Sequence, residues 1–308
     1  MRIAFLGTPD FAVPSLKMLI EEGHDLALFT NPDRPKGRHS TPALPPTKVL
    51  AQAHGIPVYQ FEKIRLPEGV AALKAYGPEL MVTAAFGQIL SQENLDIPPL
   101  GCFNVHGSLL PKYRGAAPIQ WAIIDGESKT GITIMRTEAG LDTGPILLQQ
   151  ETEIGEDETA GSLFDRLAQM GAALLREAIE KLQRGELSAV AQDASLATKC
   201  AMIKKEDGRL DFHKTASQIH NLVRGVNPWP GAYAELDGKN VKIWRTRKTQ
   251  LQGKGNIGQC VIADPKEGLF VQTGEGLLEI LELQFPGGKR MDAKAALLGH
   301  NLAGERFQ

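Results

Sequence analysis

The sequence predicts an α/β protein with a doubly wound, mostly parallel sheet, followed by a smaller C-terminal domain rich in β-strands. In the first two thirds of the chain, short apolar runs alternate with helical patterns, as strands buried on both faces alternate with crossover helices. In the last third, short strand-like runs are separated by glycines, which favours a small barrel or sandwich. A length of 308 residues fits one large or two ordinary domains.

The N-terminal elements follow from local patterns. An apolar run predicts a strand over residues 2–6, and a turn with the sequence GTPD follows it. Leu16, Leu19 and Ile20 have helical spacing and predict a helix over residues 13–22. Further apolar runs predict strands over residues 25–30, 56–58, 80–86, 101–105 and 132–136, and another that begins at Ile146.

The C-terminal elements follow a long helical pattern and a polar segment. The helix is predicted over residues 159–184, and Gly185 ends it as a C-terminal cap. A short helix is then predicted over residues 216–224, followed by strands over residues 241–244, 258–263, 269–273 and 277–283. We therefore predict one domain over residues 1–189, a linker over residues 190–207 and a second domain over residues 208–308.

Charge is unevenly distributed along the chain. From Lys204 onward there are 16 Lys and Arg against 12 Asp and Glu, a net charge of +4. Because the whole chain has a net charge of −2, the residues before Lys204 have a net charge of −6. A basic C-terminal part hints at an anionic partner, although a difference of this size often arises by chance. The proline-rich segment over residues 31–48 is also basic, and it is long for a connection between two elements. A solvated loop is the alternative interpretation of that segment.

Composition argues against several other classes of protein. The three cysteines, Cys102, Cys200 and Cys260, are far apart and odd in number, so they form neither a complete disulfide framework nor a CxxC metal site. The seven histidines show no HxH or HxxxH spacing, so we expect no metal. The N-terminus lacks a signal-peptide core, and no stretch approaches the ~20 apolar residues of a membrane helix. We expect a cytoplasmic protein with no membrane partner.

An Asn and a His lie two residues apart at the end of a predicted strand. Extended residues two apart point to the same face, so Asn104 and His106 present their side chains together. Active sites of doubly wound sheets lie at the carboxyl ends of strands. An amide and an imidazole suit the oxyanion of an acyl or formyl transfer. The alternative is that Asn104 caps a turn and that His106 is an ordinary buried histidine.

A carboxylate in a glycine-bounded loop is the third catalytic candidate. Asp142 lies in the sequence GLDTG, which follows a predicted strand. Near His106 it could hold one tautomer of the imidazole or accept a proton itself. The alternative is an Asp that accepts hydrogen bonds from turn amides. The aspartic-protease interpretation of the DTG triplet is discarded, because that chemistry needs a second such triplet and the chain has none.

Two nucleotide-binding motifs are missing from the sequence. The turn after the first predicted strand lacks the GxGxxG pattern that lets a helix N-terminus approach a pyrophosphate. The chain also has no GxxxxGK[ST] segment, so no phosphate-binding Walker loop is expected. A dehydrogenase is thus opposed despite the α/β pattern.

Asn104-x-His106, the SLLP segment at residues 108–111 and the LDTG segment around Asp142 together resemble the folate-dependent formyltransferases. Three further segments resemble the members of that family that formylate initiator tRNA. They are GTPDFA at residues 7–12, PDRPKGR at residues 32–38 and NPWPG at residues 227–231. The resemblance covers nearly the whole chain, and it implies a Rossmann-like sheet followed by an OB-like β-barrel.

The resemblance also implies the reaction and its substrates. The formyl donor is 10-formyltetrahydrofolate, and the acceptor is the α-amino group of methionine on initiator tRNA. Asn104 and His106 stabilise the oxyanion, and Asp142 supports His106 and helps to remove the amine proton. The residues implied to contact folate are Phe86, Gly87, Gln88, Ile89, Leu90, Ser108, Leu109, Leu110 and Pro111. The enzyme is expected to act as a monomer without a metal.

The tRNA contacts are assigned to two basic segments. The candidates are Arg34, Lys36 and Arg38 in the proline-rich loop, and Arg245, Arg247 and Lys248 in the second domain. For the last three, a solvated strand edge is an equally good interpretation. Two functions remain as alternatives to formylation of methionyl-tRNA. They are formylation of a small amine, such as a nucleotide-linked sugar or glycinamide ribonucleotide, and a nucleic-acid-binding module without catalysis.

Overall fold

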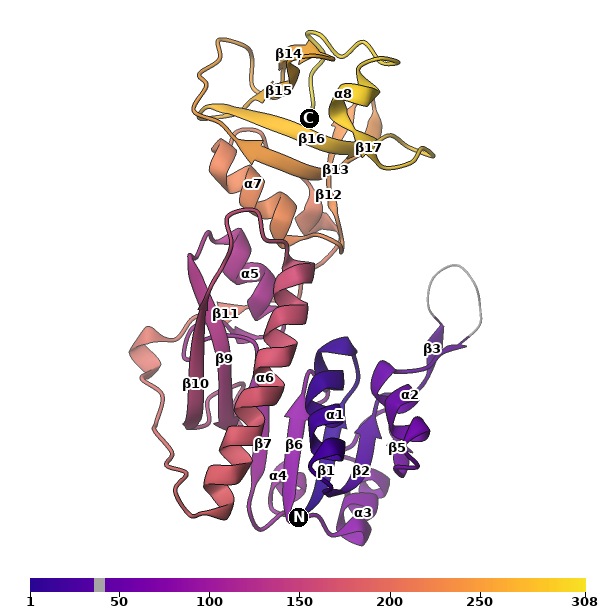
Figure 1. Cartoon of the computed structure of the whole chain (residues 1–308), viewed down its shortest axis with the longest axis vertical. Helices are drawn as coiled ribbons and strands as arrows, with labels where there is room; N and C mark the ends of the chain where they lie inside the picture. Colours follow the sequence, from indigo (N-terminus) through magenta and orange to yellow (C-terminus); the bar gives the residue numbers. More distant parts are fainter. Residues whose placement is uncertain (36–41) are drawn as a thin grey trace. The chain divides into compact units, whose positions relative to one another are not determined.

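The structure, a computed structural model, describes residues 1–35 and 42–308 (Figure 1). The chain divides into two compact units. The first comprises Met1–Pro118, Thr130–Thr152 and Phe164–Cys200. The second comprises Ile119–Lys129, Glu153–Leu163 and Ala201–Gln308, so two segments from within the predicted first domain cluster with it. The domain boundaries proposed from the sequence remain a prediction.

A seven-stranded sheet forms the centre of the first unit, with the order β10-β9-β7-β6-β1-β2-β5. Neighbouring strands from β5 to β7 pair in parallel, and β9 pairs antiparallel with β7. The mostly parallel α/β sheet expected from the sequence is therefore confirmed. Its strands are β1 Arg2–Gly7, β2 Asp25–Thr30, β5 Val58–Gln60, β6 Leu80–Ala84, β7 Cys102–His106, β9 Lys129–Arg136 and β10 Ile146–Glu153.

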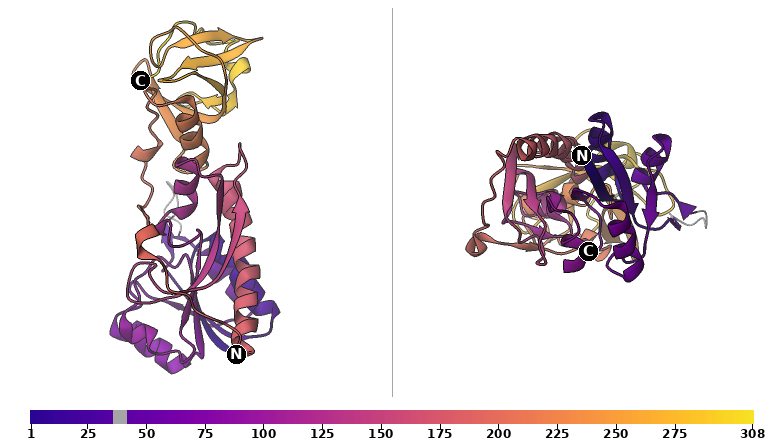
Figure 2. Two further views of the ribbon diagram at one scale, coloured as in Figure 1. Left: turned by 90° about the vertical axis from the view of Figure 1, so that its left-hand side faces the viewer. Right: turned by 90° about the horizontal axis from the view of Figure 1, so that it is seen from below.

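Helices lie on both faces of this sheet (Figure 2). On one face, Leu73 and Leu95 pack with the buried side chains of β1, β2 and β6. On the other, the ring of Phe11 contacts Phe164 of the long helix α6, with their centroids 5.2 Å apart. Burial on both faces explains why β6 is apolar except for Thr83. The helices are α1 Val13–Glu21, α2 Pro46–Ala53, α3 Pro67–Tyr76, α4 Gln92–Leu95, α5 Pro118–Ile124, which lies almost entirely in the second unit, and α6 Ala160–Gln183.

Short elements complete the first unit, and several helices, α3 among them, were not expected from the sequence. Strand β8 pairs in parallel with β11, and β3 pairs antiparallel with β4 beside the undescribed residues 36–41. Helix α3 was missed from the sequence because its buried positions, Gly69, Val70 and Leu73, make only a narrow apolar stripe. The short strands are β3 Arg34–Pro35, β4 Pro42–Ala43, β8 Arg114–Gly115 and β11 Lys199–Cys200.

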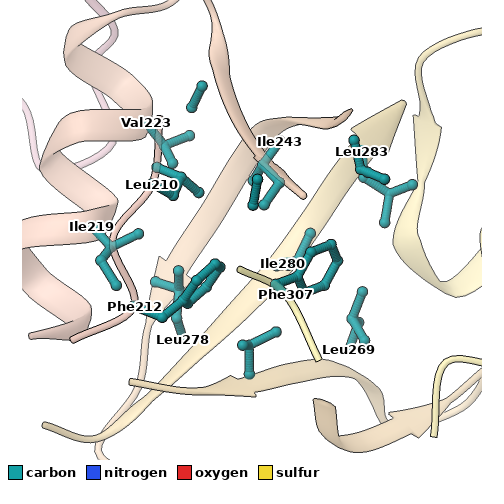
Figure 3. Close-up of a cluster of buried hydrophobic side chains, with 14 of the residues drawn as sticks. Leu210, Phe212, Ile219, Val223, Ile243, Leu269, Leu278, Ile280, Leu283 and Phe307 are labelled. Atoms are coloured by element: carbon teal, nitrogen blue, oxygen red, sulfur yellow. The ribbon is translucent and has the colours of Figure 1, made fainter. Parts of the chain in front are cut away.

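An antiparallel sheet with the order β12-β13-β16-β15-β14 forms the second unit, and β17 pairs with β16. Helix α7 supplies Ile219 and Val223 to the apolar core between helix and sheet (Figure 3). The predicted strands are present, whereas β12, β17 and the short helix α8 were missed. The elements are α7 Ala216–Gly225, β12 Ala232–Leu236, β13 Lys239–Lys248, β14 Cys260–Asp264, β15 Gly268–Gln272, β16 Leu277–Gln284, β17 Met291–Asp292 and α8 Ala293–Ala296.

Among the residues that the structure describes, every helix is too short or too polar to cross a lipid bilayer.

The penultimate residue anchors the end of the chain in the second core. Phe307 is 2% exposed, and its ring stacks on Phe212 with the centroids 5.9 Å apart. Replacing Phe307 with Ala should lower the free energy of unfolding of this unit by about 3–5 kcal/mol, because a large cavity is left in a packed core. All three tryptophans, Trp121, Trp229 and Trp244, lie in the second unit, so tryptophan fluorescence during urea unfolding reports on it.

The control for that substitution is Leu298→Ala, since Leu298 is 78% exposed. It should change the free energy of unfolding by less than about 0.5 kcal/mol. Equal losses in the two variants would contradict the assignment of Phe307 to the core.

Candidate active site

Strand β7 presents Asn104 and His106 on one face of the first sheet. It lies between β6 and β9, with Asn104 opposite Thr83 and His106 opposite Thr133. His106 is buried and Asn104 is partly exposed. Because alternate residues of a strand share a face, the two side chains lie side by side, as the sequence predicted.

A threonine on the neighbouring strand orients the Asn104 amide. The Thr83 hydroxyl donates a hydrogen bond of 2.9 Å to Asn104 Oδ1. Asn104 Nδ2 makes no hydrogen bond to any described residue. With its oxygen held by Thr83, the amide therefore keeps an N–H donor that is not hydrogen-bonded to the described residues. Thr83 was missed as a site residue, although a Thr in an otherwise apolar strand was a usable signal.

The hydrogen bonds of His106 fix its tautomer. His106 Nε2 lies 3.0 Å from the Tyr113 carbonyl oxygen, which can only accept. Nε2 therefore carries a proton and donates it to Tyr113, so the neutral ring has its lone pair on Nδ1. Tyr113 has a left-handed backbone with φ 60°, which is uncommon for a residue other than glycine. The carbonyl that sets the tautomer of His106 thus belongs to a residue with a left-handed backbone conformation.

Asp142 lies against the open nitrogen of this ring. Its Oδ2 is 3.8 Å from His106 Nδ1, and it accepts a hydrogen bond of 2.8 Å from the backbone N–H of Gly115. The Asp142 side chain is 16% exposed, and its φ of 50° is also left-handed. The three candidates from the sequence are therefore brought together. Both interpretations of Asp142 hold at once, because it binds a turn amide and also faces the imidazole.

The loop that carries Asp142 takes an indirect route. It starts beside Cys102, whose carbonyl accepts from the Thr137 N–H, at the opposite end of β7 from His106. It must therefore run back along the face of the sheet to reach the imidazole. Gly144 makes this possible, because a Cβ there would lie 1.8 Å from the Arg136 carbonyl oxygen.

The predicted folate segment after β6 contains both exposed and committed side chains. Phe86 is buried, whereas Ile89 is 71% exposed. The Gln88 amide donates to Asn31 Oδ1 at 2.6 Å and accepts from the Ile64 N–H at 2.7 Å. The side chain of Gln88 therefore shapes this segment.

The second predicted folate segment, residues 108–111, is braced from β9 and β10. The Thr133 hydroxyl donates to the Ser108 carbonyl at 2.7 Å and accepts from the Leu110 N–H at 3.1 Å. Gln149 donates to the Leu110 carbonyl at 2.7 Å. Because only Gly107 separates His106 from this segment, the bracing fixes the segment next to the imidazole.

The cations proposed to contact tRNA are paired with carboxylates where the structure describes them. Lys36 and Arg38 lie outside the described residues. The other four pairs are Arg34 with Glu62 at 2.7 Å, Arg245 with Glu282 at 3.0 Å, Arg247 with Glu279 at 2.8 Å and Lys248 with Glu156 at 2.9 Å. A phosphate would have to compete with these carboxylates, so the charge count from the sequence overstates the available positive charge.

A polar network fixes the base of the proline-rich segment. Lys48 Nζ donates to Asp33 at 2.7 Å and to Gln60 at 2.9 Å. Hydrogen bonds from Lys48 and Gln60 lower the pKa of the Asp33 carboxyl. Lys48 is therefore committed to holding the end of this segment in place.

The pairing of Arg247 distinguishes its two interpretations. Its partner Glu279 has a side chain only 4% exposed, so Arg247→Met leaves a buried carboxylate without its cation. This should lower the free energy of unfolding of the second unit by about 1–3 kcal/mol in urea titrations. Arg245→Met is the matched control, because Glu282 is 22% exposed and also contacts Arg290, and its cost should be about 0–1 kcal/mol. Loss of tRNA affinity at unchanged stability in Arg247→Met would instead assign Arg247 to phosphate binding.

Comparison with family models covers both units. Residues 1–179 match the family described as formyl transferase, and residues 202–301 match the formyl transferase C-terminal domain. Among solved structures, WlaRD, a sugar 3N-formyl transferase crystallised with dTDP and 5-N-formyl-THF, aligns with a TM-score of 0.69. That alignment covers 91% of this chain and 96% of the other at 21% identity, and it supports the fold alone.

Full-length relatives are much closer in sequence. The methionyl-tRNA formyltransferase of Ruminiclostridium cellulolyticum is 48% identical over 100% of this chain and 99% of its own length. That of Citrifermentans bemidjiense is 50% identical over 98% of this chain and 94% of its own length. With identity of this level across both units, and with Asn104, His106 and Asp142 converging on one face of the sheet, the chain belongs to the methionyl-tRNA formyltransferase family.

Proposed function

We propose that the chain transfers the formyl group of 10-formyltetrahydrofolate to the α-amino group of methionyl initiator tRNA, giving N-formylmethionyl-tRNA. The observation that carries this proposal is the convergence of one free amide donor, one imidazole of fixed tautomer and one carboxylate. Membership of the methionyl-tRNA formyltransferase family supports the choice of acceptor.

Each side chain has a role in the proposed step. The methionine nitrogen attacks the formyl carbon. The resulting oxyanion accepts a hydrogen bond from Asn104 Nδ2, which makes no hydrogen bond to any described residue. His106 Nδ1 carries the lone pair and so accepts the proton that the amine loses. Asp142, 3.8 Å away, stabilises the imidazolium that forms. The bond between the formyl carbon and folate N10 then breaks, and the proton passes to N10.

The folate donor is proposed from the protein groups around the trio. A solved relative of the same fold was crystallised with 5-N-formyl-THF. In this chain, segment 108–111 is held rigidly beside His106, and the segment after β6 presents the exposed apolar side chain of Ile89. Because the carboxyl ends of parallel neighbours meet at one edge, these two segments flank the same region. They fit a flat heterocycle that needs backbone hydrogen bonds and apolar contact.

The acceptor contacts remain proposals on two surfaces. Lys36 and Arg38 in the proline-rich segment are proposed to contact the tRNA, with Arg34 beside them. In the second unit the candidate cations are Arg245, Arg247 and Lys248, which must exchange their carboxylate partners for phosphate. Monomeric action in the cytoplasm also stays a prediction.

Transfer of labelled formyl groups tests the proposal directly. Purified protein with 10-formyltetrahydrofolate should label methionyl initiator tRNA and should leave uncharged tRNA unlabelled, because the attacking group is the methionine amine. A dTDP-linked amino sugar serves as the competing acceptor, since it is the type of substrate expected of a sugar formyltransferase. Labelling of the sugar in place of the tRNA would refute the proposal.

Asn104→Ala should lower kcat by about 10²–10³-fold, because it removes a donor aimed at the oxyanion. The affinities for folate and for tRNA should stay close to wild type in equilibrium binding, since Asn104 acts on the transition state. A variant that retains wild-type kcat would contradict the role of Asn104. A parallel loss of tRNA affinity would instead make it a binding residue.

Thr83→Val tests whether the position of the Asn104 amide matters, because it leaves the amide in place. It preserves the size of the side chain but removes the hydroxyl that holds Asn104 Oδ1. We expect a fall in kcat of about 3–10-fold, corresponding to one hydrogen bond of about 1 kcal/mol. If Thr83→Val costs nothing when combined with Asn104→Ala, the hydroxyl acts through the amide, and full additivity would show that it does not.

A further inference from the structure

A glutamine in the segment after α6 is turned inward among exposed neighbours. Residues 191 and 193–196 are exposed, whereas Gln192 is partly buried. Its position has no distinctive sequence pattern, since the surrounding segment is polar and irregular. The structure nevertheless gives its amide a complete set of partners, all within the first unit.

The Gln192 amide uses all of its hydrogen-bonding capacity. Nε2 donates to the carbonyl oxygens of Asp142 at 2.8 Å and of Gly144 at 2.7 Å. Oε1 accepts from Arg114 Nε at 3.0 Å and Nη2 at 2.7 Å. The guanidinium has no acceptor, so it fixes which end of the amide faces the two carbonyls. The donor end of Gln192 is thereby committed to the loop that carries Asp142.

This loop needs external support. Asp142 has a left-handed backbone, a conformation that persists in a residue other than glycine only where the surroundings hold it. The Gly115 N–H holds its carboxylate at 2.8 Å, but that bond leaves the backbone of the loop free to shift. The two bonds from Gln192 grip the backbone on both sides of Thr143.

We propose that Gln192 is a positioning residue for the reaction: by holding the backbone carbonyls of Asp142 and Gly144, it keeps the Asp142 carboxylate against His106 Nδ1. The expected effect on kcat rests on the proposed function. The expected effect on the position of the loop rests on the geometry of the loop alone. The amide of Gln192 is fully used by Asp142, Gly144 and Arg114, so it acts through Asp142.

Two substitutions separate the grip on the loop from the bond to Arg114. Gln192→Met removes the hydrogen bonds to the two loop carbonyls and the bonds from Arg114, while it keeps a side chain of similar length. Gln192→Glu keeps an oxygen for Arg114 but faces the two carbonyl oxygens with a second acceptor, so the grip is lost and replaced by repulsion. Gln169→Met is the matched control, because Gln169 is exposed on α6.

Hydrogen exchange and steady-state kinetics of the full-length protein provide the two readouts. We expect both Gln192 variants to speed amide exchange across residues 140–145 and to lower kcat by about 10–100-fold, with the KM values for folate and tRNA within about twofold of wild type. The unchanged KM for folate verifies that the unit is folded. Gln169→Met should match wild type in every measurement.

Other outcomes overturn the proposal. Wild-type exchange in residues 140–145 of Gln192→Met would show that the loop does not depend on this amide, whatever the enzyme's activity. Wild-type kcat in Gln192→Glu would assign the effect to Arg114. A common rise in KM and fall in kcat would indicate general disruption. Failure of the wild-type protein to transfer formyl groups would refute the proposed function, while the exchange data would still decide whether Gln192 positions the loop.

Discussion

The approach of Asp142 Oδ2 to within 3.8 Å of His106 Nδ1 is the constraint on which the candidate active site depends. Strand β7 alone provides the amide and the imidazole, but the carboxylate arrives from a loop that begins at the far end of that strand. Its return requires a glycine at Gly144 and a left-handed residue at Asp142 itself. Conformations of this kind cost of order 1–3 kcal/mol each and persist where the surrounding contacts hold them.

The parallel part of the sheet could be predicted because burial on both faces makes its strands continuous apolar runs. The runs at residues 2–6 and 25–30 correspond to strands Arg2–Gly7 and Asp25–Thr30. The direction of β9 could not be predicted, because an apolar run has the same appearance in a parallel or an antiparallel pair. That direction determines where the Asp142 loop starts, so the route of the loop could not be predicted from the sequence either.

The convergence of Asn104, His106 and Asp142 could be predicted from residue types and resemblance, but the contacts that support it could not. The tautomer of His106 is set by the backbone carbonyl of Tyr113, and the Asp142 carboxylate is held by the backbone N–H of Gly115. Every residue type has a backbone carbonyl, and every type except proline has a backbone N–H, so the residue types do not reveal these two contacts. The charge count in the second unit overstated the number of unpaired cations for a related reason, because such a count does not show that Arg247 neutralises the buried Glu279. Proposed tRNA contacts in that unit are therefore a competition between carboxylate and phosphate.

In the proposed reaction His106 donates through Nε2 to the Tyr113 carbonyl and so offers Nδ1 to the amine proton. The most direct measurement is the ¹⁵N NMR spectrum of the imidazole in labelled protein above neutral pH, with the His106 signals identified by their loss in His106→Gln. We expect a protonated-type shift at Nε2 and an unprotonated-type shift at Nδ1. A proton on Nδ1 of the neutral ring would contradict it, because the nitrogen beside Asp142 could then not accept the amine proton.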